Sequence, residues 1–413
     1  MKNLIKNLKI KRRAVALLAA MHFYGNPSSK LKVIGVTGTN GKTTTVTLLY
    51  KIASILGHKS GLIGTVEYRI GDDVFPSTHT TPGPIALNKL MKKMVEAHCE
   101  YVFMEVSSHA LDQGRVKGIN FSGGVFTNLT HDHLDYHKSF KNYFLAKKKF
   151  FEMLPVKAFA LSNADDEHGR NMVDKIKADA YFYGFDFDKK DNEFFGEILK
   201  MDFEGLRLKF DNKEIHSKLL GKFNAYNLFA VWSTCALLGF DMEKVSHILE
   251  NIEPPTGRFE HFMSDKGVLV IVDYAHTPDA LEKVLQTVKG IKPETGRIIS
   301  VFGCGGDRDP LKRRIMGKIG ATISDIAIFT SDNPRNEHPD RIIEEMKVDL
   351  SMDLSSKVIS IENRHDAIIE AVKLARENDV ILVAGKGHEN YQEIKGVRHH
   401  FNDMEELKKA LVK

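Results

Sequence analysis

The chain has 413 residues, a hydrophobic fraction of 42% and a formal net charge of +5, with no run of basic residues that would call for a nucleic-acid or membrane partner. This length is expected to form two or three domains with their own hydrophobic cores, which excludes a small disulfide-held fold. Three scattered cysteines, Cys99, Cys235 and Cys304, fit a reducing compartment, and we expect no disulfides.

The amino-terminal segment resembles a secretory signal only superficially. Basic residues at 9–13 precede an apolar stretch at 14–21, but His22 and Tyr24 interrupt it and no small-residue cleavage site follows. No run reaches the roughly 18 apolar residues needed to span a bilayer. We therefore predict one or two short helices over residues 1–30 and a cytoplasmic location.

Short β-branched apolar runs recur along the rest of the chain and alternate with helical patterns. This alternation is typical of α/β folds with mostly parallel sheets. The clearest predicted strands are 31–36, 101–106, 123–129, 268–273, 297–303, 325–330 and 379–385. In such sheets ligands bind beyond the carboxyl ends of the strands, so the residues that end each run are the candidates for chemistry.

The pattern changes between about residues 181 and 220, where turn residues recur every eight or so positions. We predict antiparallel hairpins there, inserted in or flanking the first sheet. A helical segment over 224–251 follows, and the Pro- and Gly-containing residues 252–260 indicate a domain boundary. The prediction is two α/β domains, 31–256 and 257–413.

The sequence TGTNGKTTT at residues 37–45 lies between a predicted strand and a predicted helix. Gly38 and Gly41 allow backbone N–H groups to turn toward a phosphate, Lys42 supplies a positive charge and Thr43 a hydroxyl for Mg²⁺. The formal phosphate-loop template departs at Val36, where it requires glycine. The alternative is a strand-to-helix turn that merely contains glycine.

Oxygen and nitrogen ligands for a metal follow two other strands. Glu105 ends the strand 101–106, where a phosphate-binding loop would place its metal partner, although a solvated glutamate is the alternative. The segment 128–137 is dense in ligand types and could equally form a metal site, a pair of helix caps or a polar turn. Its candidate ligands are His131, Asp132, His133, Asp135 and His137.

An ordered series of motifs resembles that of the Mur ligases, most closely the branch that adds meso-diaminopimelate. The motifs are TGTNGKTTT, TTPGP, MEVSSHALDQGR, FTNLTHDHLDYH, FLAKKKFF, GKFNAYN, GRFE, DYAHTPDAL, FGCGGDRD, SDNPR and AGKGHE. The resemblance covers about residues 25 to 413 and implies a P-loop-type central ATPase domain with a mostly parallel sheet, followed by a Rossmann-like carboxyl-terminal domain.

The resemblance also implies residue roles. ATP would be bound by Gly38, Thr39, Asn40, Gly41, Lys42, Thr43, Thr44, Asn224, Asn227, Arg258 and Asp273. Two Mg²⁺ ions would be held by Thr43, Glu105, His133 and Lys147, and the catalytic residues would be Lys42, Glu105, His133 and Lys147. Lys147 matches the lysine that the family carbamylates with CO₂, which turns a cation into an oxygen-bearing anion. Without the resemblance, Lys147 would be interpreted as a lysine on a solvated helix face.

Both organic substrates are implied in the same way. The muramoyl peptide would contact Thr80, Thr81, Ser107, Gln113 and Arg115. Without the resemblance, these would be interpreted as polar residues of loops and helix caps. The incoming amino acid would contact Arg308, Asn333, Arg335, Gly385 and Glu389. Arg335 in SDNPR favours meso-diaminopimelate over lysine, because a guanidinium pairs with a carboxylate and repels an ammonium. Glu389 would suit the distal ammonium.

The implied reaction is ATP-dependent addition of meso-diaminopimelate to UDP-N-acetylmuramoyl-L-alanyl-D-glutamate through an acyl phosphate, in peptidoglycan precursor synthesis. Because Arg258, Asp273 and Arg308 fall in the second predicted domain, we expect the site to assemble when the domains close. Family members also carry an amino-terminal domain for the UDP group, whereas here about 30 residues precede the first strand. We expect that the muramoyl peptide dominates recognition, that another chain supplies the uridine site, or that the acceptor lacks UDP. The enzyme itself is expected to be a monomer.

Two other functions remain open. A ligase similar to folylpolyglutamate synthetase would share the fold and the ATP site, but SDNPR and AGKGHE argue against it. A nucleotide-binding scaffold without catalysis would not need Lys42, Glu105, His133 and Lys147 to be present together.

Overall fold

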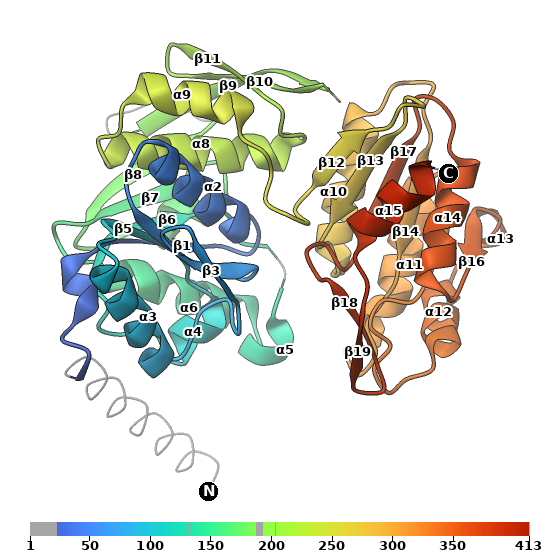
Figure 1. The fold of residues 1–413 in the computed structure, drawn as a ribbon, viewed down its shortest axis with the longest axis horizontal. Helices are drawn as coiled ribbons and strands as arrows, with labels where there is room; N and C mark the ends of the chain where they lie inside the picture. The colour runs from blue at the N-terminus through green and yellow to red at the C-terminus, as the bar shows by residue number, and fades with distance from the viewer. Residues whose placement is uncertain (1–22, 131, 187–192, 203, 413) are drawn as a thin grey trace, which may run out of the picture. The chain divides into compact units, whose positions relative to one another are not determined.

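The computed structural model describes residues 23–412, apart from residues 131, 187–192 and 203. The predicted amino-terminal helices lie outside the described residues, except for the 3₁₀ helix η1 (Pro27–Lys30). The chain divides into two compact units, one that extends to Glu253 and one over Pro254–Lys413 that also includes the short segments 201–205 and 220–222. Each unit contains a central sheet with helices packed on it (Figure 1).

The first unit is built on a sheet of 11 strands in the order β11-β10-β9-β8-β7-β6-β1-β5-β2-β3-β4. Its strands are β1 (Lys32–Thr37), β2 (Ser60–Ile63), β3 (Glu67–Ile70), β4 (Asp73–Pro76), β5 (Tyr101–Glu105), β6 (Phe121–Phe126), β7 (Phe159–Asn163), β8 (Asp179–Gly184), β9 (Glu193–Asp202), β10 (Gly205–Phe210) and β11 (Lys213–Ser217). Its helices are α2 (Lys42–Ile55), α3 (Pro84–Glu96), α4 (Ser108–Asp112), α5 (Leu134–His137), α6 (Phe140–Glu152), α7 (Gly169–Met172), α8 (Lys222–Leu237) and α9 (Met242–Asn251).

The centre of this sheet is parallel, as the buried apolar runs predict. β1 lies between β5 and β6 and is parallel to both, and β2 continues the parallel order beyond β5. Val33, Ile34 and Val36 of β1 are fully buried, because helices cover both faces of a parallel sheet. The carboxyl ends of β1, β5 and β6 therefore lie at one edge, which gathers the loops that follow them.

Two local predictions for the first unit need correction. The segment 181–220 contains a predicted antiparallel pair in β10 and β11, but its first strands extend the sheet in parallel, since β8 is parallel to β7 and β9 is parallel to β8. Turn spacing alone cannot tell a hairpin from a strand that extends a parallel sheet. The single helical segment over 224–251 is two helices, because Gly239 adopts a φ of 75° after α8 and Asp241 caps α9.

The second unit has a six-stranded sheet in the order β12-β13-β17-β14-β15-β16 and a separate two-stranded sheet of β18 and β19. Its strands are β12 (Glu260–Met263), β13 (Leu269–Asp273), β14 (Ile298–Phe302), β15 (Ile326–Phe329), β16 (Val358–Ser360), β17 (Val380–Ala384), β18 (Tyr391–Ile394) and β19 (Val397–His400). Its helices are α10 (Pro278–Ile291), α11 (Leu311–Ile323), α12 (Pro339–Lys347), α13 (Met352–Ser355), α14 (Arg364–Leu374) and α15 (Asp403–Val412).

Alternate residues of the second sheet pack against different helices. Val270 and Val301 share a hydrophobic cluster with Ile368 of α14 and Leu407 of α15, which lie side by side on one face (Figure 1). Phe302, one position along β14, packs against α11, where a Cβ on Gly320 would lie 2.2 Å from its ring. The strand period of two thus places helices on both faces, and all strands except β12 run parallel.

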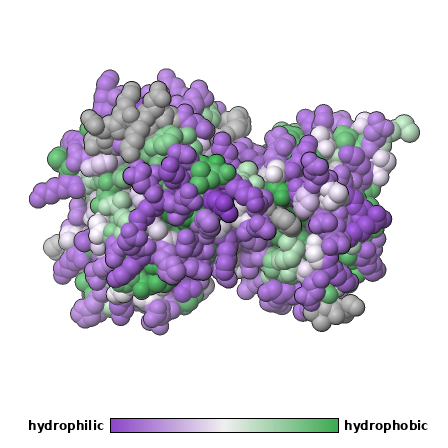
Figure 2. Space-filling model, turned by 90° about the horizontal axis from the view of Figure 1, so that it is seen from above, coloured by the Kyte–Doolittle hydropathy of each residue, from purple (hydrophilic) through white to green (hydrophobic). Residues whose placement is uncertain are grey.

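Within the part of the chain that the structure describes, no helix has the length and apolar character to cross a bilayer. On the face shown in Figure 2, hydrophilic residues predominate and hydrophobic residues occur in small groups.

Candidate active site

The loop between β1 and α2 is held by the residues that follow β6. The Thr127 hydroxyl donates to the Asn40 carbonyl oxygen at 2.6 Å, and the Asn128 side-chain oxygen accepts from the Asn40 backbone N–H at 2.9 Å. A Cβ at Gly38 would lie 1.9 Å from Thr127 Oγ1, so this close approach requires glycine. The result is a fixed loop at the amino terminus of a 14-residue helix, which is an anion-binding arrangement.

Predicted nucleotide-side residues of α8 contact the same loop. A Cβ at Gly41, whose φ is 85°, would lie 2.3 Å from Asn227 Oδ1. Asn227 in turn donates to Asn224 Oδ1 at 3.1 Å, and both asparagines are buried. Thr43 and Thr44 lie in the first turn of α2 and are also buried. The structure therefore places Asn227 against the loop and Asn224 beside Asn227, while their role in ATP binding stays a prediction of the resemblance.

Two lysines converge on one carbonyl oxygen of the loop. Lys42 Nζ donates to Gly38 O at 2.8 Å and to Thr39 O at 2.7 Å, while Lys147 Nζ donates to Gly38 O at 2.7 Å. Lys147 lies on α6 and its side chain is 1% exposed, so the solvated-face interpretation is wrong. Tyr143 supports the group, since its hydroxyl lies 3.0 Å from Thr39 Oγ1 and its ring lies beneath the Lys147 ammonium.

The proximity of these positive charges has electrostatic consequences. Burial, reinforced by the charge of Lys42, holds the pKa of Lys147 well below its ordinary value. Partial loss of hydration, together with Lys42 and Lys147, lowers the pKa of His133 to about 4, against the opposing effect of Asp132. His133 therefore presents a neutral imidazole at pH 7, the form that binds a metal.

Glu105 is a buried carboxylate held only by neutral donors. It is 1% exposed, and it accepts from the Thr65 backbone N–H at 2.7 Å and from the Thr65 hydroxyl at 3.1 Å. No lysine, arginine or histidine of the described residues forms an ion pair with it. A buried anion without a cation is costly, so this carboxylate fits a metal ligand better than a solvated glutamate.

The five predicted muramoyl-peptide residues form one network beside Glu105. The Thr81 hydroxyl donates to Glu105 O at 2.8 Å and lies 3.3 Å from Ser107 Oγ, and Thr80 Oγ1 lies 3.0 Å from Thr65 Oγ1. Arg115 donates to Thr81 O at 2.8 Å and to Gln113 Oε1 at 2.8 Å. Thr65 was not predicted, although it follows a strand end, as the other site residues do.

The acidic and histidine-rich segment after β6 is only partly described. His131 lies outside the described residues, and His137 is buried with its Nε2 3.0 Å from Ser108 Oγ. The described residues contain no group of three or more His, Cys, Asp or Glu side chains that converge as metal ligands. Nor does any hydrogen bond or ion pair join Glu105 to His133 there. The predicted set of Thr43, Glu105, His133 and Lys147 stays a prediction.

In the second unit, Arg258 and Asp273 lie on adjoining segments. The Arg258 guanidinium stacks over the Tyr274 ring, 4.6 Å from its centroid. The Asp273 carboxylate accepts from the backbone N–H groups of Phe259 and Ala275, both at 2.8 Å. Burial raises the pKa of Asp273, whereas Arg258 lowers it. The end of β13 thus carries Asp273, with Arg258 beside it in the segment that precedes β12.

The predicted amino-acid residues follow β14, β15 and β17, which are parallel neighbours. Asn333 Nδ2 donates to Glu389 Oε2 at 2.8 Å, and Arg335 Nη1 donates to Gly306 O at 2.7 Å. A Cβ built at Gly305 would lie 3.0 Å from Arg335 Nη1 and 3.7 Å from Arg308 Cγ, so the two arginines flank one loop. Gly385 has a φ of 115°, and a Cβ there would lie 2.6 Å from Asp332 Oδ2.

A fully buried ion pair supports these strand ends from behind. Arg364 donates to both carboxylate oxygens of Asp403 at 2.7 Å, and both side chains are 0% exposed. The same guanidinium donates to Ala384 O at 3.0 Å, one residue before Gly385. Arg364 of α14 thus links the first residue of α15 to the end of β17.

A second ion pair holds the loop that carries Arg308. Glu337 accepts from Arg313 at 2.8 Å and also from the backbone N–H of Asp307. Its hydrogen bond to Arg313, whose side chain is 1% exposed, lowers the pKa of Glu337 to about 2. This interaction ties α11 to the residues that precede α12.

We expect Glu337→Gln to lower the free energy of unfolding by about 1–2 kcal/mol at pH 7. Because the folded-state pKa lies below the unfolded value of about 4.3, this stability is present above pH 4.3 and is lost as the pH falls toward 2. Urea unfolding from pH 7 to pH 3 should therefore show the difference from wild type shrinking. Glu344→Gln, an exposed change on α12, should have little effect. A difference that stays constant with pH would contradict the charge argument.

Both domain models of one enzyme family match the chain. The Mur ligase middle domain matches residues 36–235, and the model described as "Mur ligase, glutamate ligase domain" matches residues 257–387. The chain is 51% identical over 390 residues to the UDP-N-acetylmuramoyl-L-alanyl-D-glutamate--2,6-diaminopimelate ligase of Bacteroides fragilis, which covers 94% of this chain and 80% of that protein. The identity to the protein of the same name from Aquifex aeolicus is 44%, over 95% of this chain and 80% of that protein.

Solved structures agree. A UDP-N-acetylmuramoyl-L-alanyl-D-glutamate--2,6-diaminopimelate ligase superimposes with a TM-score of 0.67 at 34% identity, covering 92% of this chain and 78% of the other. A folylpolyglutamate synthase from Mycobacterium tuberculosis gives a TM-score of 0.70 at 18% identity, over 89% and 91% of the two chains, and shares the fold. Since identities of this order with the diaminopimelate ligases extend over nearly the whole chain, this protein belongs to the Mur ligase family of ATP-dependent ligases.

Proposed function

We propose that this protein adds meso-diaminopimelate to the D-glutamyl carboxylate of UDP-N-acetylmuramoyl-L-alanyl-D-glutamate, with cleavage of ATP to ADP and phosphate. The observation that carries the proposal is a pattern of charges among the residues predicted to bind the incoming amino acid, here called the amino-acid pocket. These residues are Arg308, Asn333, Arg335, Gly385 and Glu389. Arg335 and Arg308 flank the Gly305 loop, and the Glu389 carboxylate lies on the other side of Asn333. The distal end of meso-diaminopimelate carries a carboxylate and an ammonium, which match these opposite charges.

The available hydrogen-bond donors support this match. Among the described residues, Arg335 Nη2 donates to no protein group, and Glu393 lies 3.7 Å from its Nε. Arg308 is exposed and forms no ion pair with any described residue. Two guanidinium groups are therefore available for a carboxylate. Lysine, which has no distal carboxylate, would leave both without a carboxylate of the substrate.

The chemistry requires two steps in which this chain supplies positioning and charge. An oxygen of the glutamyl carboxylate attacks the γ-phosphorus, and the bond to the ADP oxygen breaks, which forms an acyl phosphate. The diaminopimelate amine then attacks the acyl carbon, and phosphate leaves as the nitrogen loses a proton. Lys42, at the start of α2 with its Nζ against the loop, would neutralise the phosphate charge, and the network of Thr80 to Arg115 would orient the muramoyl peptide.

Use of Mg²⁺ follows from membership of the family, and the donor set fits it. The Glu105 carboxylate and the Thr43 hydroxyl are hard oxygen donors, and His133 is neutral. Lys147 is buried and forms no ion pair with a described carboxylate, so it is suited to carry CO₂ as a carbamate with Thr43, Glu105 and His133 as the other ligands. When bound, Mg²⁺ would offset negative charge on the transferred phosphate.

The test is phosphate release by the purified full chain with ATP, Mg²⁺, meso-diaminopimelate and the UDP-linked dipeptide, with the product identified by mass. We expect one amide formed per phosphate, little turnover with lysine and none with folate and glutamate. No turnover with any muramoyl dipeptide would overturn the proposal. A UDP-free acceptor in the same assay shows whether the uridine end contributes, and a response to added cell extract would point to a partner chain that binds it.

A further inference from the structure

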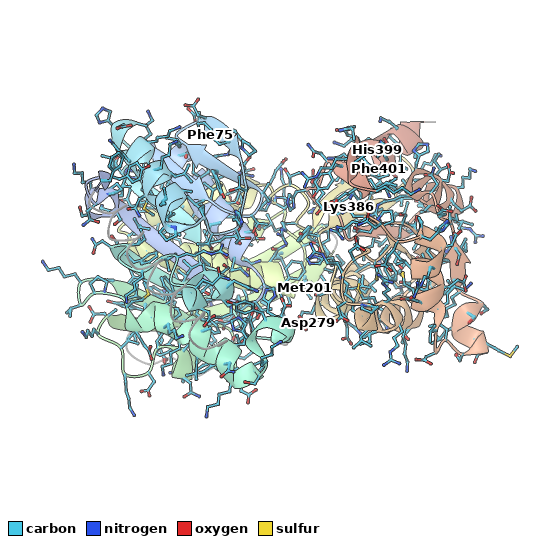
Figure 3. The ribbon with its side chains drawn as sticks, turned by 90° about the horizontal axis from the view of Figure 1, so that it is seen from below. Phe75, Met201, Asp279, Lys386, His399 and Phe401 are labelled. Carbon is cyan, nitrogen blue, oxygen red and sulfur yellow. The ribbon has the colours of Figure 1, made fainter. Side chains whose placement is uncertain are left out.

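Lys386 is a buried cation that contacts two of the predicted amino-acid-binding residues, Asn333 and Glu389. It follows β17, is labelled in Figure 3 and is 0% exposed. Its Nζ donates to Asn333 Oδ1 and to Glu389 Oε2, both at 3.2 Å, and lies 5.5 Å from the centre of the Tyr391 ring. A buried ammonium is costly unless it is paired, and both of its hydrogen-bond acceptors belong to predicted substrate contacts.

These contacts determine how Asn333 is oriented. Asn333 Oδ1 accepts from Lys386 Nζ and also from the Glu393 backbone N–H at 2.8 Å. An ammonium and a backbone N–H are donors only, so the amide oxygen must face them. The amide nitrogen then faces Glu389, to which it donates at 2.8 Å. Rotation of the amide by 180° would place donor against donor on both sides.

The same contacts determine which oxygen of Glu389 is available. Oε2 accepts from both Lys386 and Asn333, while Oε1 accepts from no described residue. The Glu389 side chain is 19% exposed, so its carboxylate is held at one oxygen and open at the other. Lys386 also cancels the charge of Glu389, which sets how strongly the pocket attracts a lone ammonium.

We propose that Lys386 is a positioning residue for the incoming amino acid, which locks the Asn333 amide and leaves one oxygen of Glu389 for the distal ammonium. This inference rests on the proposed function. Lys386 itself does not touch the substrate. It acts through Asn333 and Glu389, and its charge favours a distal group that is both ammonium and carboxylate over one that is ammonium alone.

The experiment compares wild type with Lys386→Met, which keeps the length of the side chain and removes its donors. We expect KM for meso-diaminopimelate to rise about tenfold, with KM for ATP and for the UDP-linked dipeptide unchanged. The preference for meso-diaminopimelate over lysine should fall, because the pocket becomes more negative. Lys373→Met, an exposed change on α14, serves as the matched control and should behave as wild type.

A double-mutant cycle with Asn333→Ala tests the route. If Lys386 acts in part through Asn333, Lys386→Met should raise KM by a smaller factor in the Asn333→Ala background than in wild type, with the remaining effect due to Glu389. Additive effects of the two substitutions would overturn the inference. So would an unchanged KM for meso-diaminopimelate in Lys386→Met, whether or not its melting temperature is lower. If Lys386→Met is insoluble, Lys386→Gln is measured against the same criteria. Wild-type turnover with unchanged variants refutes this inference alone, whereas absence of wild-type turnover refutes the proposed function as well.

Discussion

Replacement of Lys147 by alanine is expected to lower kcat by about a thousandfold, the largest effect of any single change considered for this protein. The amine is buried against Gly38 O beside Lys42, at the carboxyl edge of the central strands. Alanine removes the ammonium through which α6 donates to the Gly38 carbonyl oxygen of the loop. Phosphate release is the measurement, and nucleotide binding, followed separately, should persist because the backbone of the loop is unchanged.

The control for this change is the adjacent Lys148, whose Nζ donates to Asn171 O at the surface. Lys148→Ala should retain nearly the wild-type rate. If Lys147 carries a carbamate, ¹³C-labelled bicarbonate should give a carbonyl signal that Lys147→Ala lacks, and a short carboxylate in the buffer should restore part of the activity. A Lys147→Ala enzyme with most of its rate intact would contradict the assignment of this residue to catalysis.

Replacement of Arg335 by alanine is expected to raise KM for meso-diaminopimelate about a hundredfold, with KM for ATP unchanged. Its guanidinium is fixed at one end by Gly306 O, and its backbone pairs with the hairpin, where it accepts from Lys395 N at 2.7 Å. Arg335→Lys should recover little, because an ammonium cannot form the paired contact with a carboxylate.

The matched control is Arg314→Ala on α11, which removes an exposed arginine that lies 3.6 Å from Asp349. Initial rates at varied diaminopimelate give the comparison. If Arg335→Ala and Arg314→Ala have the same KM, Arg335 does not recognise the distal carboxylate, and the preference for diaminopimelate would have to come from Arg308.

The parallel strands and the phosphate loop could be predicted because their signal is local. Buried runs such as 101–106 have few polar residues until the strand ends, and Glu105 marks that end. Gly38 and Gly41 likewise indicate places where other groups approach the backbone closely. In the structure these groups are the side chains of Thr127 and Asn227. The assignment of Lys147 needed family resemblance, since a lysine within KKK carries no local sign of burial.

Other features could not be predicted because they depend on contacts between residues that are far apart in the sequence. The β18–β19 hairpin has mostly exposed residues and no apolar alternation, yet Glu393 N fixes Asn333. Thr65 becomes important only when the fold brings it to Glu105, 40 positions away. Turn spacing also does not distinguish the parallel pairs β7–β8 and β8–β9 from the antiparallel pair of β10 and β11.

The Arg364–Asp403 pair means that the last helix is not a dispensable tail. Asp403→Ala would leave the buried Arg364 guanidinium without its carboxylate, at a cost of about 3–5 kcal/mol, and would weaken the support that this guanidinium gives to the Ala384 carbonyl, which precedes Gly385. Through Arg364, α15 would thus influence the shape of the pocket although none of the predicted amino-acid contacts lies on it. Random mutagenesis with selection for an altered amino-acid preference should therefore yield substitutions in α15 as well as in the residues of the pocket.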